Sequence, residues 1–419
     1  SDWEDGNSKT NNKRRLSGRA ATNSKKSVRH SDSPVSSRGS SSSYCLTPVL
    51  RPRRNVVPVR EEAMETDSGT DNELVEAVDS TVIERTVNRS EHSDDQPDNG
   101  TPEPSMFEVL QRKDASVEEI CDSWMEKYRR GSTESLVQLL QFIIHSTGCK
   151  GVLTPEIMRK TVNDLLMDFV KDFSDEEAGY YPLIRTGKSA LIFRHNFSEF
   201  FYQWTKRLGR KMFSDDHEDF MEGFNMVVLG MTDHQLRNYR HTATVAVIKI
   251  MSALINERLS VFMKMHDKQR QLDAEQNKRL NERSEDRINV LRASQMSLEE
   301  DFENYKTLLE FYHKCVFNKR FRDTCTEIRI LCISALGSWM KQFPQEYVRD
   351  SYLKFFDVTL TDPSAQVRCA CLEYLLPLYM DGELSDKLRQ FTSKCKNRLM
   401  GMTVNANADV SEKAIRLIT

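Results

Sequence analysis

Residues 328–336 read IRILCISAL, and this pattern occurs twice more toward the C-terminus. It aligns with VRCACLEYL at residues 367–375 and with VSEKAIRLI at residues 410–418, at spacings of 39 and 43 residues. Such spacings are typical of HEAT repeats, whose periods are about 40 residues and whose helix pairs bury their apolar faces on one another. The pattern therefore predicts an all-α HEAT-repeat solenoid. The fifth position is small each time, which allows close helix approach, and is occupied by Cys332, Cys371 and Ala414.

The segment before the repeats contains no helix-breaking residue. Neither Gly nor Pro occurs between Gly230 and Gly337, a span of 106 residues, and residues 256–304 are rich in charged side chains and Gln. Long helices with largely polar surfaces are the simplest interpretation of such a stretch. We predict a projecting pair of long antiparallel helices, with a turn at Ser284 or at residues 294–297.

Helix-start signals also occur nearer the N-terminus. Residues 116–119 read SVEE, a capping box that opens a helix with Ile120, Trp124 and Tyr128 on one face. Residues 154–156 read TPE, which places Pro at the first position of another helix. We divide the chain into a disordered tail at residues 1–105, an N-terminal helical region at 106–232, long helices at 233–316, and HEAT repeats at 317–419 that the C-terminus truncates.

The formal net charge of −3 hides two opposite blocks in the tail. Residues 1–60 carry 13 Lys and Arg against 4 Asp and Glu, whereas residues 61–105 carry 2 against 14, so the rest of the chain is neutral. This division excludes a uniformly basic protein that coats DNA. Thirteen of the first fifty residues are Ser, and such a segment buries too little apolar surface to fold. We interpret the acidic block as a solubilising linker that could shield the basic block.

The tail also contains short functional motifs. Two basic clusters lie about ten residues apart, a spacing typical of a bipartite nuclear-import signal, although a generic solvated tail would have the same composition. Three Ser-Pro or Thr-Pro pairs are candidate sites for proline-directed kinases, whose phosphates would reduce the basic charge. The import candidates are Lys13, Arg14, Arg15, Lys25 and Lys26, and the phosphorylation candidates are Ser33, Thr47 and Thr101.

Several classes of protein are excluded. No run of about 18 apolar residues could cross a membrane, and the N-terminus lacks the pattern of a signal peptide. Nine Cys residues, an odd number, indicate reduced thiols inside a cell. We find no phosphate-binding Gly-rich loop, no nucleophile elbow and no metal-ligand spacing, so we expect no enzyme, cofactor or metal. Because the chain starts without Met and stops inside a repeat, we expect a piece of a longer protein.

Two clusters of cations in the helical body are candidate DNA contacts. Charges of this kind often stabilise the C-terminal ends of helices, and that is one interpretation. The other is a local surface for DNA phosphates, which would bind duplexes without reading their sequence. The first cluster contains Lys206, Arg207, Arg210 and Lys211, and the second contains Lys319, Arg320 and Arg322 beside aromatic residues.

Short stretches across the body carry a family resemblance. GCKGVLT at residues 148–154, RHTAT at 240–244, RFRD at 320–323, DSYLK at 350–354 and FTSK at 391–394 have the order and separations of one family. From about residue 106 to residue 419 the sequence resembles the stromal antigen (stromalin) subunits of cohesin.

The resemblance implies a fold and a set of partners. It implies a hook-shaped HEAT solenoid that binds the kleisin subunit of cohesin and, through it, the SMC ring. It also implies double-stranded DNA held without sequence specificity, a surface for loading, release and protection factors, and a place on chromosomes in the nucleus. Family members are more than twice this length, so we expect most of the kleisin-binding solenoid to be missing.

The sequence departs from the family at one surface. Members that capture aromatic peptides use a Trp shortly after the DSYLK stretch and an Arg-Phe pair after FTS, where this chain has Val358 and Lys394-Cys395. Aromatic side chains usually dominate such anchors, so we expect weak binding of aromatic peptides or a different partner. The rest of this candidate partner surface is Asp350, Tyr352, Lys354 and Phe355.

A second class of function stays open. A HEAT adaptor of the nuclear-transport type would carry cargo and have no role on DNA. It would show no salt-dependent affinity for DNA, and it would leave the import signal in the tail unexplained. A helical hydrolase is the third possibility, and it would need clustered His and carboxylate side chains in a pocket.

Overall fold

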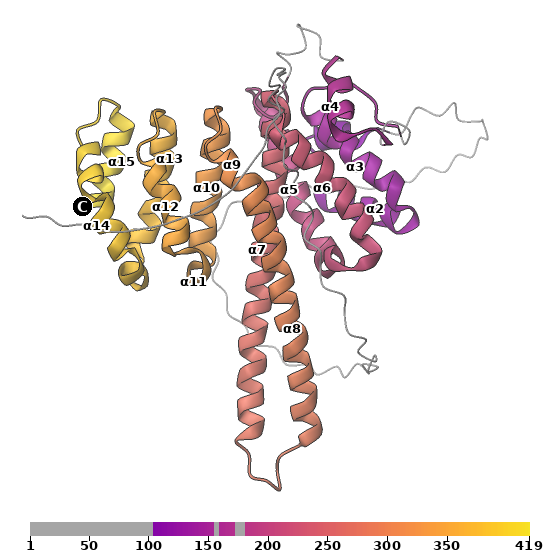
Figure 1. Cartoon of the computed structure of the whole chain (residues 1–419), viewed down its shortest axis with the longest axis vertical. Helices are drawn as coiled ribbons and strands as arrows, with labels where there is room; N and C mark the ends of the chain where they lie inside the picture. The colour runs from indigo at the N-terminus through magenta and orange to yellow at the C-terminus, as the bar shows by residue number, and fades with distance from the viewer. Residues whose placement is uncertain (1–103, 155–158, 172–180) are drawn as a thin grey trace, which may run out of the picture. The chain divides into compact units, whose positions relative to one another are not determined.

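A computed structural model of the chain describes residues 104–154, 159–171 and 181–419 (Figure 1). These residues belong to one compact unit, Leu46–Thr419, and they form helices and no β-strand. The all-α prediction is confirmed. The predicted disordered tail lies outside the described residues except for residues 104 and 105. Of the predicted helix start at residues 154–156, only Thr154 is described.

The N-terminal helices pack around a cluster of aromatic side chains. Trp124, Phe142 and Trp204 are each at most 2% exposed, and the rings of Trp124 and Trp204 lie 6.0 Å apart in an edge-to-face arrangement. The helices are α1 (Met106–Leu110), α2 (Val117–Arg130), α3 (Ser132–Ser146), α4 (Val162–Lys171), α5 (Lys188–Leu208) and α6 (Glu218–Asp233), with the short helices η3 (Gly209–Phe213) and η4 (Asp215–His217) between α5 and α6.

The capping box lies one helix earlier than we predicted. Ser116 does cap α2, since its hydroxyl accepts a hydrogen bond from the Glu119 amide, but the reciprocal bond is not formed. Both bonds of a capping box are present at α1, where Ser105 and Glu108 satisfy each other's backbone amides. The predicted helix over residues 117–130 is nevertheless correct.

Helices α7 (Arg237–Gln276) and α8 (Glu285–Tyr312) form a long antiparallel pair that extends beyond the neighbouring helices (Figure 1). Ser284 caps α8, so the turn at this residue is correct, whereas residues 294–297 lie inside α8. The first half of α7 is buried on nearly all sides because it passes between other helices, and the second half is polar. The predicted projecting helix pair is confirmed.

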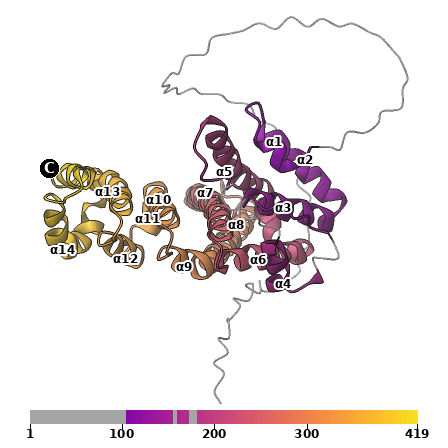
Figure 2. The same cartoon turned by 90° about the horizontal axis from the view of Figure 1, so that it is seen from above.

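The repeats form two rows of helices after the hairpin. In Figure 2, α10 and α13 lie in one row and α12 and α14 in the other. The three aligned stretches fall in α10, α13 and α15, and Cys332, Cys371 and Ala414 are fully buried between helices. A Cβ atom added at Gly337 would lie only 2.4 Å from the Cβ atom of Tyr374, so α10 and α13 approach closely. The HEAT-repeat prediction is confirmed. The elements are η5 (His313–Phe317), α9 (Asn318–Arg320), α10 (Thr326–Gln342), α11 (Pro344–Tyr347), α12 (Asp350–Thr359), α13 (Ala365–Met380), η6 (Gly382–Leu384), α14 (Ser385–Met402) and α15 (Ala408–Ile418).

Candidate nucleic-acid and partner interfaces

The first basic cluster lies where α5 ends and η3 begins. Helix α5 stops at Gly209, whose φ of 48° is a conformation that favours glycine. Arg207 donates to the Asp122 carboxylate on α2 at 2.6 Å and so ties α5 to α2. Arg210 pairs with Asp301 on α8 at 2.9 Å. These two arginines therefore hold helices together.

The two lysines of the same cluster have a different environment. Lys206 and Lys211 are exposed, and neither forms an ion pair with a residue that the structure describes. The Lys206 ammonium lies 5.9 Å from the centre of the Tyr202 ring. Tyr202 borders a cleft of about 380 Å³ between α5, α7 and α10, and Lys249 lies in the same cleft. This end of α5 thus has two exposed cations without an ion pair among the described residues, and Lys206 lies next to a residue that borders the cleft.

The second basic cluster follows the π-helical turn η5 at the end of α8. Lys319 contacts the Asp233 carboxylate at 2.5 Å. Arg320 lies 3.4 Å from the same carboxylate and 2.7 Å from Asp323. Arg322 is exposed and lies over the Phe321 ring at 4.9 Å, without an ion pair in the described part of the chain. Of the seven cations proposed from the sequence, Lys206, Lys211 and Arg322 are the ones without such a pair.

The structure brings the second cluster against the candidate partner surface. The rings of Phe321 and Phe355 meet edge to face with their centres 4.7 Å apart, although about thirty residues separate them in sequence. The Lys354 ammonium lies 5.3 Å from the centre of the Phe355 ring. Arg322 and Lys354 therefore flank one aromatic pair. Spacing alone could not reveal this arrangement, because it depends on how Phe321, just after α9, packs on Phe355 of α12.

The candidate partner residues on α12 differ in exposure. Asp350 and Lys354 are exposed, Val358 is 44% exposed, and Tyr352 is half-buried. Phe355 is only 3% exposed and thus forms the base of the surface rather than its outer face.

On α14, Lys394 is exposed but Cys395 is fully buried. The Cys395 thiol lies 3.2 Å from the Asp357 carboxylate, which also pairs with Arg398. Burial and the neighbouring carboxylate raise the pKa of the Cys395 thiol to about 12, so this thiol stays protonated. Burial alone would raise the pKa of Asp357, but the bonds from Cys395 and Arg398 lower it. At the position where the resemblance led us to expect an aromatic ring, this chain has a small buried thiol in a polar network.

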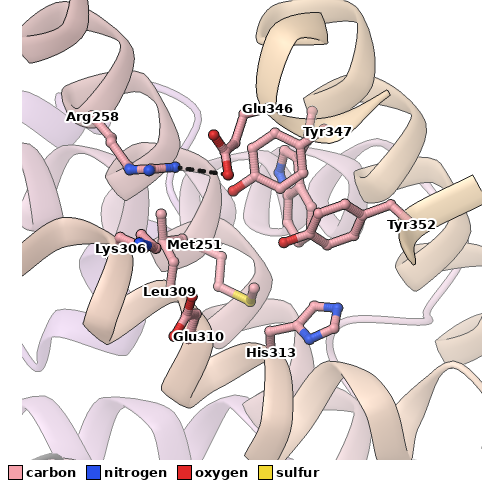
Figure 3. Close-up of a pocket in the computed structure, with 10 residues that line it drawn as sticks. Met251, Arg258, Lys306, Leu309, Glu310, His313, Glu346, Tyr347 and Tyr352 are labelled. Carbon is pink, nitrogen blue, oxygen red and sulfur yellow. Dashed lines mark ion pairs between the residues drawn. The ribbon is translucent and has the colours of Figure 1, made fainter. Parts of the chain in front are cut away.

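A small pocket beside this surface was missed by the sequence analysis. It has a volume of about 30 Å³ and lies between α7, α8, η5, α10, α11 and α12 (Figure 3). Arg258 points into it and is 3% exposed, with its guanidinium 3.6 Å from the Glu346 carboxylate. His313 lines the opposite side, and burial, together with Lys354, lowers its pKa to about 4. Arg258 lies in the uninterrupted helical stretch, where nothing in the sequence distinguishes it from the surface cations.

Two features are absent from the part of the chain that the structure describes. Among residues 104–154, 159–171 and 181–419, no helix is both long and apolar enough to cross a membrane, and no group of three His, Cys, Asp or Glu side chains could hold a metal ion. The import candidates Lys13, Arg14, Arg15, Lys25 and Lys26 and the phosphorylation candidates Ser33, Thr47 and Thr101 lie outside the described residues.

Two protein-family models match the chain. The model of the STAG domain matches residues 179–294, which include α5 and α7, and the model of the stromalin conservative domain matches residues 322–396, which include α12. In these two regions the chain is similar to the stromalin family. The resemblance noted from the sequence is thereby confirmed, and both candidate interfaces lie largely in or next to regions that define the family.

Alignments with curated relatives show how much of each protein is matched. The chain is 34% identical over 322 residues to cohesin subunit SA-1 of Xenopus laevis, an alignment that covers 77% of this chain and 25% of the relative. It is 30% identical over 334 residues to cohesin subunit SA-3 of Homo sapiens, an alignment that covers 80% of this chain and 27% of the relative. The chain therefore spans about a quarter of the length of these relatives.

A solved structure supports the same fold. Cohesin subunit Scc3 from Z. rouxii superimposes with a TM-score of 0.66 at 19% identity, over 75% of this chain and 36% of that chain. At this identity the likeness concerns the fold alone.

Proposed function

We propose that this chain is part of a non-enzymatic cohesin subunit that acts on chromosomes in the nucleus, in sister chromatid cohesion and chromosome segregation. The observation that carries the proposal is the pair of domain matches, at residues 179–294 and 322–396, in a chain whose curated relatives are cohesin subunits. In this role the solenoid docks on a kleisin and, through it, on the SMC ring.

Kleisin binding is the first part of the proposal to test. The full chain should co-purify with a kleisin when the two are expressed together, and the complex should survive size-exclusion chromatography. The α12 variant Lys354→Glu tests whether the candidate partner surface contributes, because Lys354 is exposed and forms no ion pair in the described region. Failure of the unmodified chain to bind any kleisin would contradict the proposed role.

DNA binding without sequence readout is the second part. Lys206, Lys211 and Arg322 are the candidate contacts, because they are exposed and form no ion pair among the described residues. Each contact between a cation and a phosphate releases condensed counterions, which makes the affinity depend on salt. Reversing all three to Glu should weaken duplex binding equally for unrelated sequences and flatten the salt dependence by about 0.9 for each cation lost. Arg292→Glu is the matched control, because Arg292 is an exposed cation on α8 that belongs to neither cluster.

The DNA experiment also separates the two classes of function. A nuclear-transport adaptor would show no salt-dependent affinity for the duplex and no response to the triple variant. Unchanged affinity in the triple variant would instead favour the interpretation that these clusters stabilise helix ends. Repeating the titration with residues 104–419 shows how much of the affinity depends on the basic tail.

We propose that the candidate partner surface on α12 and α14 receives cohesin regulators, including loading, release and protection factors. We also propose that this surface has little affinity for aromatic peptides. Val358 and Cys395 offer far less ring-stacking area than a Trp and a Phe. Because Val358 is 44% exposed, Val358→Trp should be tolerated and should tighten binding of a peptide with two aromatic residues several-fold by isothermal titration calorimetry. Low-micromolar binding of that peptide to the unmodified chain would overturn this part of the proposal.

A further inference from the structure

The far end of the α7–α8 hairpin presents one apolar side chain to solvent. Residues 277–284 connect the two helices, and Leu280 in this connection is 85% exposed. Exposed leucines are common on protein surfaces, and one alone indicates nothing. What distinguishes Leu280 is the way in which the connection that carries it is fixed.

A buried carboxylate fixes the connection. Glu275, at the end of α7, is 3% exposed. Its carboxylate accepts hydrogen bonds from the Lys278 ammonium at 2.8 Å and from the Ser284 amide at 3.2 Å, and it lies 3.5 Å from the Arg287 guanidinium. Bonds from Lys278 and Ser284 hold the pKa of Glu275 below its ordinary value, so the carboxylate stays charged at neutral pH. One side chain thus ties both ends of the connection together.

Further contacts support the same geometry. Arg283 donates a hydrogen bond to the backbone carbonyl of Gln276, and the Glu282 amide donates to the Arg279 carbonyl at 2.9 Å. Beneath the connection, Leu272, Ile288 and Leu291 form a small apolar core between the two helices. A surface loop held in this way loses little conformational entropy when it binds a partner. The connection is therefore preorganised, with Leu280 and the exposed Arg279 at its tip.

We propose that the tip of the hairpin docks into another protein, through a leucine-sized apolar pocket with a carboxylate at its rim. Leu280 fills the pocket and Arg279 pairs with the carboxylate. The Arg279 side chain is exposed and forms no ion pair or hydrogen bond among the described residues, so its charge is available. An apolar anchor beside an arginine, on a rigid element, is a favourable centre for a protein interface.

Charges at the tip favour a protein over DNA as the occupant. Lys278 and Arg287 already pair with Glu275, and Arg283 is half-buried and bonded to the backbone. Three acidic side chains, Glu282, Glu285 and Asp286, are exposed at the same end. DNA binding depends on several unpaired cations and gains little from an exposed leucine. The inference does not rest on the proposed cohesin role, because it is argued from the contacts and charges of the hairpin tip alone.

The test is photo-crosslinking of the full chain in cells that express it. Asn281→benzoylphenylalanine places the reactive group next to Leu280 and leaves this side chain intact, and Met263→benzoylphenylalanine, at a site 61% exposed on the side of α7, is the control. We expect a protein adduct from position 281 and not from 263, mapped by mass spectrometry to an apolar pocket with Asp or Glu at its rim. Adding Arg279→Glu should lower the yield about tenfold, equivalent to about 1.4 kcal/mol, whereas adding Arg292→Glu should not.

A charge-swap rescue decides the outcome. Changing the mapped acidic residue of the partner to Lys should restore the adduct with the Arg279→Glu chain. An adduct on DNA, equal yields at positions 281 and 263, or a yield insensitive to Arg279→Glu would each overturn the proposal. Co-purification of the kleisin, measured in the same cells, reports separately on the proposed function.

Discussion

The two basic clusters have similar sequences but differ in what their cations bind. At the end of α5, Arg207 pairs with Asp122, whose side chain is 67% exposed. Beyond η5, Arg320 pairs with Asp323, whose side chain is 1% exposed. Exposed ion pairs contribute little to stability, whereas loss of one partner from a buried pair leaves an uncompensated charge. The burial of the carboxylate therefore decides which ion pairs are structural.

Asp323 is the centre of the second cluster. Its carboxylate accepts two hydrogen bonds from the Arg240 guanidinium, at 3.0 and 3.1 Å, and one from the Cys325 amide at 2.8 Å. It also accepts a hydrogen bond from Arg320. Burial would raise the pKa of Asp323, but the bonds from Arg240 and Cys325 outweigh it and lower the pKa. Through these bonds Asp323 joins the start of α7 to the segment between α9 and α10.

The largest expected effect is that of Asp323→Ala. The substitution leaves Arg240, itself 12% exposed as a side chain, without its carboxylate, so we expect a loss of about 3–5 kcal/mol in the free energy of unfolding. Urea denaturation followed by circular dichroism measures it. Asp122→Ala is the matched control at the first cluster and should leave the unfolding free energy nearly unchanged. Equal losses in the two variants would remove the contrast between the clusters.

Acid should lower the free energy of unfolding through His241, which follows Arg240 on α7 and so lies next to the second cluster. The ring is 9% exposed and contacts the Tyr181 hydroxyl at 2.6 Å, and burial lowers its pKa to about 4. Because the folded chain then binds the proton more weakly than the unfolded chain, the stability present above the unfolded pKa of about 6.5 is lost as the pH falls toward 4.

We expect this loss to reach about 3 kcal/mol, at about 1.4 kcal/mol for each unit of pKa difference. Urea denaturation at a series of pH values measures it, and His241→Gln should show a shallower decline over the same range. Parallel declines in the variant and the unmodified chain would mean that His241 is not the group responsible.

The sequence predicts the fold well because the fold depends on periodic patterns. The repeat of residues 328–336 reflects the close packing of helices in a solenoid. The absence of Gly and Pro from residue 231 to residue 336 reflects the length of the helices there, because both residues destabilise a helix interior. The turn at Ser284 could not be separated from the alternative at residues 294–297, because Ser is compatible with both a helix cap and an exposed helical position.

The sequence predicts the candidate interfaces less completely because they depend on pairings between distant elements. Lys206 and Arg207 are neighbours in sequence, yet only Arg207 meets a carboxylate of another helix. Likewise, no local pattern indicates that Phe321 meets Phe355 or that Arg258 is buried. Composition locates the clusters, but tertiary packing decides which charges remain available.

A smaller effect is expected within the first cluster itself. Arg210 pairs with Asp301, whose side chain is 5% exposed, and donates to the Ser297 hydroxyl at 3.0 Å. Because a hydrogen bond to a buried charged group contributes about 1.5–3 kcal/mol, Arg210→Gln should lower the unfolding free energy by about that amount. Arg207→Gln, which affects the exposed Asp122, should have a much smaller effect in the same urea experiment. A larger loss from Arg207→Gln would show that exposure of the carboxylate is the wrong criterion.

The smallest expected effect compares two cations of the second cluster in DNA binding. Lys319 is paired with Asp233 at 2.5 Å, whereas Arg322 lies over the Phe321 ring and keeps its charge available. Arg322→Gln should reduce the slope of log affinity against log salt concentration by about 0.9, and Lys319→Gln should reduce it by less than half of that, because Asp233 already neutralises Lys319. Fluorescence anisotropy with one duplex over a range of salt concentrations measures both slopes. Equal reductions would mean that the ion pair with Asp233 opens when DNA binds, and cations paired with exposed carboxylates would then count as available.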